Sequence, residues 1–220
     1  MDPGRGARPV SEPAFRSALA GLGWVGIAGA LGFLWGGATS FAQGSLPEEV
    51  VSFANSVSGW TVPTFLCVLV AGRWRMPRTP TVAALMGMAM FSLLLQGYAV
   101  VSTARGFPDS YGPGTFFFWA AVIGGPIIGV CAAWQRSEHP WQRALGLSVL
   151  VAILLGEGAY GLLFLLGTTS WVYWTGALVS GIVVLGAGMI FRVTRSRWRA
   201  LLLALSACGA GAYLLLFWPR

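Results

Sequence analysis

Apolar positions along the chain gather in seven long runs, which short polar or arginine-bearing segments separate. A helix needs about 20 mostly apolar residues to cross the hydrocarbon core of a bilayer, and each run comes near or above that length. The pattern predicts an all-α, polytopic transmembrane helix bundle with one domain at 17–218 after an N-terminal tail at 1–16. The expected spans are 17–41, 50–72, 80–101, 114–134, 144–167, 171–191 and 200–218. The first run is too long for a signal peptide, so we treat it as a retained helix.

The arginines orient these spans, because all basic residues of the chain are arginine and they alternate between the two sides. Seven spans put the larger group on the side of the N-terminus: Arg5, Arg8, Arg16, Arg73, Arg75, Arg78, Arg136, Arg143, Arg192, Arg195, Arg197 and Arg199. Only Arg105 and Arg220 fall on the other side. By the positive-inside rule we expect a cytoplasmic N-terminus and an outside C-terminus, in a multi-pass protein of the bacterial cytoplasmic membrane.

Composition supports a membrane protein and explains the net charge of +7. Hydrophobic residues make up 56% of the chain and charged residues 10%. A nucleic-acid binder gathers its basic residues on one solvated surface, whereas these form short clusters between apolar runs. We therefore expect the lipid bilayer as partner and no nucleic acid. Cys67, Cys131 and Cys208 lie in apolar runs without metal-ligand or disulfide spacing, so we interpret them as buried small hydrophobes.

Enzyme signatures are missing from the sequence. His139 is the sole histidine and lies in a polar loop, so no membrane-embedded histidine can ligate a metal or act as a base. The adjacent pair Glu48 and Glu49 has no companion histidine or DxxD motif, which ranks an enzyme acting on lipid last. We expect a protein that is not an enzyme, without catalytic residues, metal ligands or a cofactor.

Glu157 is the only charged residue in the long apolar stretch LLGEGAYGLL. A carboxylate near the middle of a membrane is costly and usually faces the bundle interior or a water-filled cavity, which makes it a candidate functional residue. Tyr160, three residues later, shares its face on a helix. The alternative is a structural role, in which a protonated Glu157 donates one hydrogen bond to a neighbouring helix.

The second run contains an unusual polar cluster between Asn55 and Thr64. Ser45 and Glu48 have the spacing of a capping box, which predicts a helix start near 46. Pro63 disfavours an intact helix around residue 59, and broken membrane helices often mark binding sites. One alternative is a proline kink in which Ser and Thr side chains form hydrogen bonds with the freed backbone groups. The other is an interfacial helix at 46–54 followed by a re-entrant turn. A second kink is expected at GGPIIG, 124–129.

The position of each polar residue along its predicted span puts most of them in the outer half of the bundle. Glu157 lies slightly beyond the middle of the fifth span, near the polar break in the second, and Gln96 lies in the outer third of the third span. The predicted ligand-binding residues are Glu157, Tyr160, Asn55, Trp60 and Gln96. Trp171, Tyr173 and Trp174 are interpreted as an aromatic belt at the membrane interface.

Small residues recur at the spacing that lets helix backbones approach closely in lipid. The ridge of Ala28, Gly32 and Gly36 on the first span is the clearest case. Intramolecular packing is the favoured interpretation, and docking of a membrane protein partner is the alternative.

Several short motifs resemble a family of uncharacterised actinobacterial integral membrane proteins, for which no activity is implied. They are Gly36, Thr39 and Gln43, then Asn55-Ser56, Trp60, Gly72-Arg73 and Glu157. The architecture also resembles, more loosely, the S components of energy-coupling-factor transporters. That resemblance implies an outward-opening site for a vitamin or metal and a small-residue surface for a coupling partner. The seventh span departs from their usual six helices.

Two functions follow from the sequence. The first is binding or translocation of a small solute through an outward-facing polar cavity. Glu157 would be its charged or proton-linked group, Asn55, Gln96 and Tyr160 would supply hydrogen bonds, and Trp60 would form an aromatic wall. The second is a non-transporting accessory or scaffold protein that docks a larger membrane partner.

Overall fold

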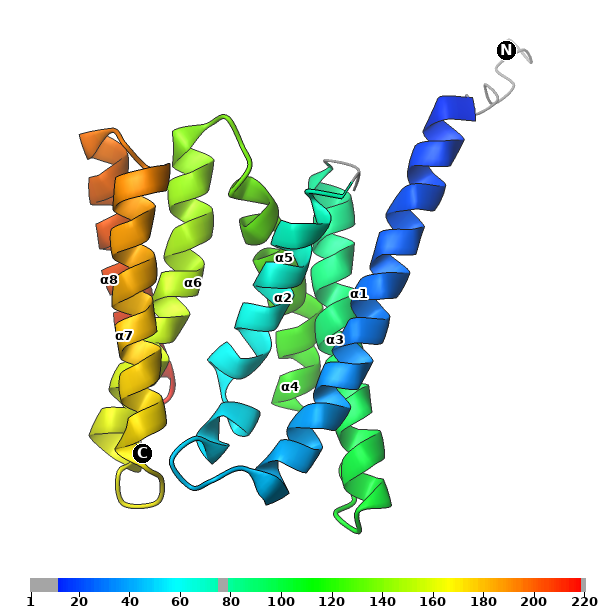
Figure 1. The fold of residues 1–220 in the computed structure, drawn as a ribbon, viewed down its shortest axis with the longest axis vertical. Coiled ribbons are helices and arrows are strands. Elements are labelled where there is room, and N and C mark those ends of the chain that lie inside the picture. The colour runs from blue at the N-terminus through cyan, green and yellow to red at the C-terminus, as the bar shows by residue number, and fades with distance from the viewer. Residues whose placement is uncertain (1–11, 75–78, 219–220) are drawn as a thin grey trace, which may run out of the picture.

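The computed structural model describes residues 12–74 and 79–218, and over these residues the chain forms helices and no strands (Figure 1). The helices are α1 Glu12–Ser45, α2 Val57–Ala71, α3 Pro80–Ala104, α4 Phe116–Trp119, α5 Gly125–Trp134, α6 Pro140–Tyr160, α7 Trp171–Ala187 and α8 Ser196–Leu216. A 3₁₀ turn precedes α2 (η1, Val51–Asn55), and π-helical turns follow α4, α6 and α7 (η2 Ala120–Gly124, η3 Gly161–Leu165, η4 Gly188–Arg192).

Six helical segments within the described residues are long and apolar enough to cross a membrane. They are α1, α3, α4 with η2 and α5, α6 with η3, α7 with η4, and α8. The shorter apolar helix α2 is the seventh expected span. The predicted all-α transmembrane bundle is confirmed.

The ends of the helices alternate between the two ends of the bundle (Figure 1). The start of α1, the end of α2, the start of α3 and the connections from α5 to α6 and from α7 to α8 lie at one end. Among described arginines, Arg73, Arg136 and Arg195 belong to this end, which we call the arginine end, and Arg105 belongs to the other. Arg5, Arg8, Arg75, Arg78 and Arg220 lie outside the described residues. The cytoplasmic placement of the arginine end stays a prediction.

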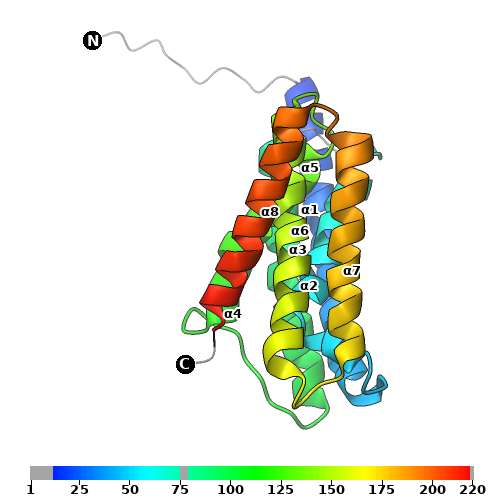
Figure 2. The same ribbon diagram turned by 90° about the vertical axis from the view of Figure 1, so that its left-hand side faces the viewer.

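Two groups of helices make up the bundle, and α6 connects them. In the first group α1 packs along α3, α3 along α5, and α2 against α5 and α3; in the second, α7 and α8 both pack on α6 (Figure 2). Contacts of α6 with α5 and α2 join the groups. A space between the groups is therefore bordered by α2, α3 and α4 on one side and by α6 and α8 on the other.

Glycines allow the backbones of α1 and α3 to touch. A Cβ atom on Gly32 or Gly36 would overlap the carbonyl oxygen of Met90 or Leu94, and Ala28 on the same face is fully buried. The small-residue ridge that the sequence offers as a docking surface is therefore covered by α3 of the same chain. This is the intramolecular packing that the spacing favours.

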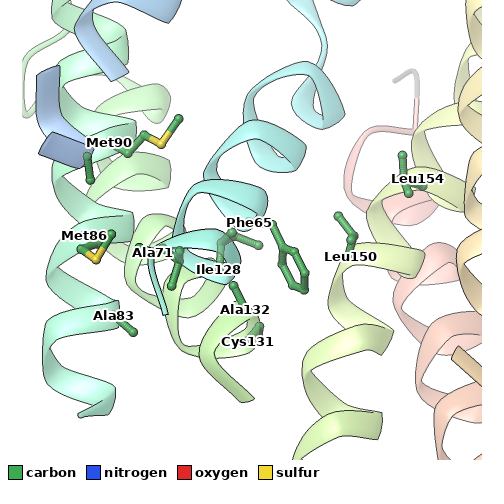
Figure 3. Close-up of a cluster of buried hydrophobic side chains, with 12 residues drawn as sticks. Phe65, Ala71, Ala83, Met86, Met90, Ile128, Cys131, Ala132, Leu150 and Leu154 are labelled. Carbon is green, nitrogen blue, oxygen red and sulfur yellow. The ribbon is translucent and has the colours of Figure 1, made fainter. Parts of the chain in front are cut away.

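Apolar side chains fill the half of the bundle nearer the arginine end. Phe65, Met86, Ile128 and Leu150 bring together α2, α3, α5 and α6 in one buried cluster (Figure 3). A second, smaller apolar cluster of Trp60, Phe91, Leu94, Leu95 and Ala121 lies toward the other end of the bundle.

The cysteines do not behave alike. Cys131 is buried in this apolar cluster and Cys67 is partly buried, whereas Cys208 is exposed on α8. The prediction that all three are buried is wrong for Cys208, because α8 packs on α6 with one side only.

Helix boundaries differ from the predictions at the start of the chain and around residue 46. Helix α1 already begins at Glu12, ahead of the expected first span at 17–41, while residues 1–11 lie outside the described part. The predicted capping box is wrong, because Ser45 ends α1 and its hydroxyl donates to the Phe41 carbonyl at 2.8 Å. The helix that follows begins only at Val57.

Pro63 lies inside α2 without breaking it, which corrects the expected interruption near residue 59. A proline has no N–H to donate to the carbonyl four residues earlier. The structure compensates for this loss, since the indole N–H of Trp35 on α1 donates to the Gly59 carbonyl at 3.1 Å. The interruption lies instead at Ser56, which has an extended backbone.

Candidate functional site

Helix α2 begins inside the bundle, and side chains satisfy the first of its backbone N–H groups. The Ser56 hydroxyl accepts from the Gly59 N–H at 2.8 Å. Glu157 Oε1 accepts from the Val57 N–H at 2.5 Å, and Oε2 accepts from the Ser58 N–H at 2.8 Å. The first N–H groups of a helix have no partners within the helix, and in a hydrocarbon environment no water replaces them. Glu157 therefore caps α2 across the gap between the two helix groups.

Glu157 is buried beside the backbone N–H groups that begin α2. Its side chain is buried with 3% exposure, and its carboxylate lies at the positive end of the α2 dipole. The predicted structural alternative expected a protonated group that donates one hydrogen bond. The structure shows each carboxyl oxygen of Glu157 accepting one backbone hydrogen bond, which a carboxylate and a protonated carboxyl group can both do.

The glycines beside Glu157 serve helix packing. A Cβ on Gly156 would lie 2.7 Å from the Tyr213 Cβ on α8, and one on Gly158 would lie 2.7 Å from the Leu178 backbone nitrogen on α7. Both neighbouring helices can therefore approach α6 at the level of the carboxylate.

Tyr173 extends the network around the start of α2. Its hydroxyl donates to the Ser56 hydroxyl at 2.5 Å and lies 2.8 Å from the Ser58 hydroxyl. Together with Glu157 it holds the first turn of α2 against α6 and α7.

The predicted aromatic belt holds only in part. Trp171 is exposed, as a belt residue would be, but Trp174 is buried and its indole donates to the Thr169 hydroxyl at 2.8 Å. The belt interpretation is wrong for both Trp174 and Tyr173. Trp174 packs against Gly158 and Gly161 on the α6 side, and Tyr173 contacts Phe53, Ser56 and Ser58 at η1 and the start of α2. Gly161 leaves the room that the Trp174 ring occupies.

A cavity of about 380 Å³ lies between the two helix groups, beside the start of α2. Four of the five predicted ligand-binding residues line it: Asn55, Trp60, Glu157 and Tyr160. The cavity is in the half of the bundle away from the arginine end, as their predicted depth requires. Two of the π-helical turns adjoin it through Ala120 and Leu165, and such turns are frequent at functional sites. The turn at Ala120–Gly124 directly precedes Pro126, where the sequence predicts a kink.

Gln96 does not reach this cavity. It is exposed and belongs to a separate hollow with Asp109 and Tyr111. Its neighbour Leu95 lines the cavity, and one residue along a helix turns the side chain by about 100° to another face. The expected convergence of Gln96 with Asn55 and Glu157 is therefore wrong.

Aromatic residues make up half of the sixteen described residues that line the cavity, a concentration that the sequence pattern does not predict. The rings belong to Trp60, Phe91, Phe116, Phe117, Tyr160, Trp174, Tyr213 and Phe217. Polar groups gather at one place, where Asn55, Ser56 and Glu157 surround the start of α2. Aromatic residues near the ends of membrane spans are common, so their clustering could be recognised only from contacts in the folded chain, such as that between Phe116 on α4 and Phe217 beyond α8.

The other end of α2 is capped as well. The Arg136 side chain donates to the Leu69 carbonyl, one of the last in the helix, and a cation there matches the negative end of the dipole. A Cβ on Gly72 would overlap the Arg136 guanidinium, so this glycine keeps the approach open.

Replacing Tyr173 with phenylalanine is expected to lower the free energy of unfolding by roughly 1–2 kcal/mol, because Ser56 and Ser58 lose a shared hydrogen-bonding partner. Thermal unfolding of the detergent-solubilised protein measures the change. Tyr160→Phe is the matched control, since the Tyr160 hydroxyl has no hydrogen bond among the described residues. Equal melting temperatures for the two variants would contradict the assigned network.

The fold and site define a class of protein: a polytopic α-helical membrane protein with a buried carboxylate, an interrupted helix and an internal cavity. A family model described as "Family of unknown function (DUF6518)" matches residues 16–219. The chain belongs to this family, in agreement with the resemblance to an uncharacterised family. Neither the curated proteins nor the solved structures contain a match to the chain.

Proposed function

We propose that this protein binds a small solute in the cavity beside α2, as a non-enzymatic binding or translocating protein of the bacterial cytoplasmic membrane. The observation that carries the proposal is the meeting of Asn55, Trp60, Glu157 and Tyr160 on one cavity at the start of an interrupted helix. With the arginine end in the cytoplasm, this cavity belongs to the outer half of the membrane.

The size of the cavity supports binding of a small organic molecule. Ligand pockets in proteins span about 300–1,000 Å³ and combine apolar walls with a few polar groups, and this cavity of about 380 Å³ has both properties. Asn55 and Val57 are exposed at its polar end. The indole nitrogen of Trp60, in the wall, is buried without an acceptor in the described part of the chain.

In this proposal Glu157 both fixes the cavity wall and contacts the solute. Its hydrogen bonds to the Val57 and Ser58 N–H groups fix the start of α2, which forms part of the cavity wall. These bonds use two of the about four acceptor sites of a carboxylate, so the group can still accept a hydrogen bond from a solute. The packing of Gly32 and Gly36 against α3 of the same chain supports solute binding over the scaffold alternative, which would use this ridge for docking.

Access to the cavity can be tested with a single cysteine at Ala120, which lines it, in a chain whose native cysteines are replaced by alanine. A small, water-soluble methanethiosulfonate reagent is expected to modify Ala120→Cys in the detergent-solubilised protein. Intact-mass measurement over time gives the rate. A cavity that takes up a solute from water must admit this reagent.

Ala132→Cys is the matched control. Ala132 belongs to α5, one helical segment beyond Ala120, and is fully buried in the apolar cluster. It is expected to react at least about tenfold more slowly, as a buried side chain shielded from water does. Equal rates at the two positions, or no reaction at Ala120→Cys, would refute the proposed function.

A further inference from the structure

The wall of the cavity combines aromatic faces with one carboxylate and, among the described residues that line it, no basic side chain. From this combination, and resting on the proposed function above, we propose that the solute is a lipophilic organic cation, with an ammonium or phosphonium type of charge surrounded by apolar groups.

The aromatic rings form a connected wall around the cavity. Trp60 on α2 contacts Phe117 with ring centroids 6.1 Å apart, and Phe117 contacts Phe116 at 5.7 Å. Phe116 on α4 meets Phe217 beyond α8 at 6.4 Å, and Phe217 contacts Tyr160 on α6 at 6.2 Å. The contacts therefore link α2, α4, α8 and α6. The face of each ring carries negative electrostatic potential, and aromatic cages of this kind recognise quaternary ammonium groups.

The charge of the wall favours a cation over an anion. Among the described residues that line the cavity, Glu157 is the only ionisable acid or base other than the tyrosines. Arg105, near the same end of the bundle, is engaged elsewhere: its guanidinium donates to the Ser40 carbonyl and lies over the rings of Phe41 and Phe107. An anion in the cavity would meet a carboxyl group and ring faces of negative potential, with no cation among the described lining residues to compensate it.

The apolar part of the wall determines what kind of groups must surround the charge of the ligand. Leu95, Ile153 and Leu165 lie between the aromatic side chains, so most of the occupant's surface must be apolar. A bare metal ion does not fit, because hard cations need six or more oxygen ligands and the cavity offers one carboxylate with few other oxygens. A cation whose charge is enclosed by apolar groups satisfies both the carboxylate and the rings.

Tetraphenylphosphonium and tetraphenylborate test the sign of the charge, because they carry the same four phenyl groups around a central atom of opposite charge. Equilibrium dialysis against the purified full chain in a neutral detergent measures both affinities. We expect the phosphonium to bind at least about tenfold more tightly than the borate, as cation–π contacts in a desolvated site allow. Ala120→Trp, which fills the cavity from its wall, is expected to abolish phosphonium binding.

Aromatic substitutions test the wall without altering the helix cap. Phe117→Leu and Phe217→Leu keep an apolar side chain but remove the ring, and each is expected to weaken phosphonium binding by about three- to tenfold. Phe191→Leu is the matched control, since Phe191 is exposed on η4 and does not line the cavity. Equal losses in all three variants would overturn the proposal.

The outcomes separate this inference from the proposed function. Borate binding that equals or exceeds phosphonium binding, and that Ala120→Trp abolishes, would overturn the cation while leaving a solute-binding cavity. Phosphonium binding that survives Ala120→Trp would place the cation elsewhere and also overturn the inference. If neither probe bound, the inference of a cation would also be overturned. Rapid modification of Ala120→Cys would in that case still support the proposed solute-binding cavity.

Discussion

Replacing Glu157 with alanine is expected to lower the free energy of unfolding by roughly 2–6 kcal/mol, because the Val57 and Ser58 N–H groups lose their acceptor inside the bundle. A buried donor left without a partner costs about 1–3 kcal/mol, and more when the lost partner was charged. The change is measured as the loss of folded protein on heating in detergent, beside the unmodified chain.

Glu157→Gln is the graded control for this experiment. A glutamine has one carbonyl oxygen, which can accept from one of the two N–H groups, while its NH₂ group opposes the other. We therefore expect a stability between those of the alanine variant and the unmodified protein. An alanine variant that melts like the unmodified protein would refute the assigned cap.

Gly36→Ala is the second change with a large expected effect. The added Cβ would overlap the carbonyl oxygen of Leu94, a backbone atom that can move only if α1 and α3 separate. We expect a loss of about 3 kcal/mol or more, at the upper end of the cost of overpacking. Thermal unfolding and the yield of monodisperse protein both report it.

Gly26→Ala is the matched control on the same helix. A Cβ at Gly26 would meet no atom within 4 Å, so the substitution adds only helix propensity. It is expected to leave stability unchanged or to raise it by up to about 1 kcal/mol. If the variants at positions 26 and 36 were equally stable, the close packing of α1 on α3 would be contradicted.

The spans of the bundle could be predicted because they depend on composition alone. Twenty apolar residues are enough to cross the membrane, whatever surrounds them, and the alternation of arginines agrees with the ends at which the helices meet. The start of α2 could not be predicted in this way. Its position at Val57 depends on acceptors from Ser56 and from Glu157, which lies a hundred residues further along the chain.

For the candidate site, the sequence predicted how deep each residue lies in the membrane, but not toward which side of its helix the side chain points. Counting residues along each span correctly placed Asn55, Trp60 and Glu157 near one level, where the cavity lies. The face that each residue presents depends on how the helices are rotated, which counting does not determine. Gln96 therefore lies outside the cavity, whereas Phe116 on α4 and Phe217 beyond α8 line it and contact each other.

The two caps of α2 also have a consequence for the order in which the protein assembles. At 15 residues, α2 is about 22 Å long, shorter than the hydrocarbon core of about 30 Å, so it depends on its capping groups. Arg136 and Glu157 both follow α2 in the chain and are synthesised after it. The ribosome therefore delivers α2 into the membrane before either cap exists, and the contacts of Tyr173 with the first turn of α2 form only after α7 follows.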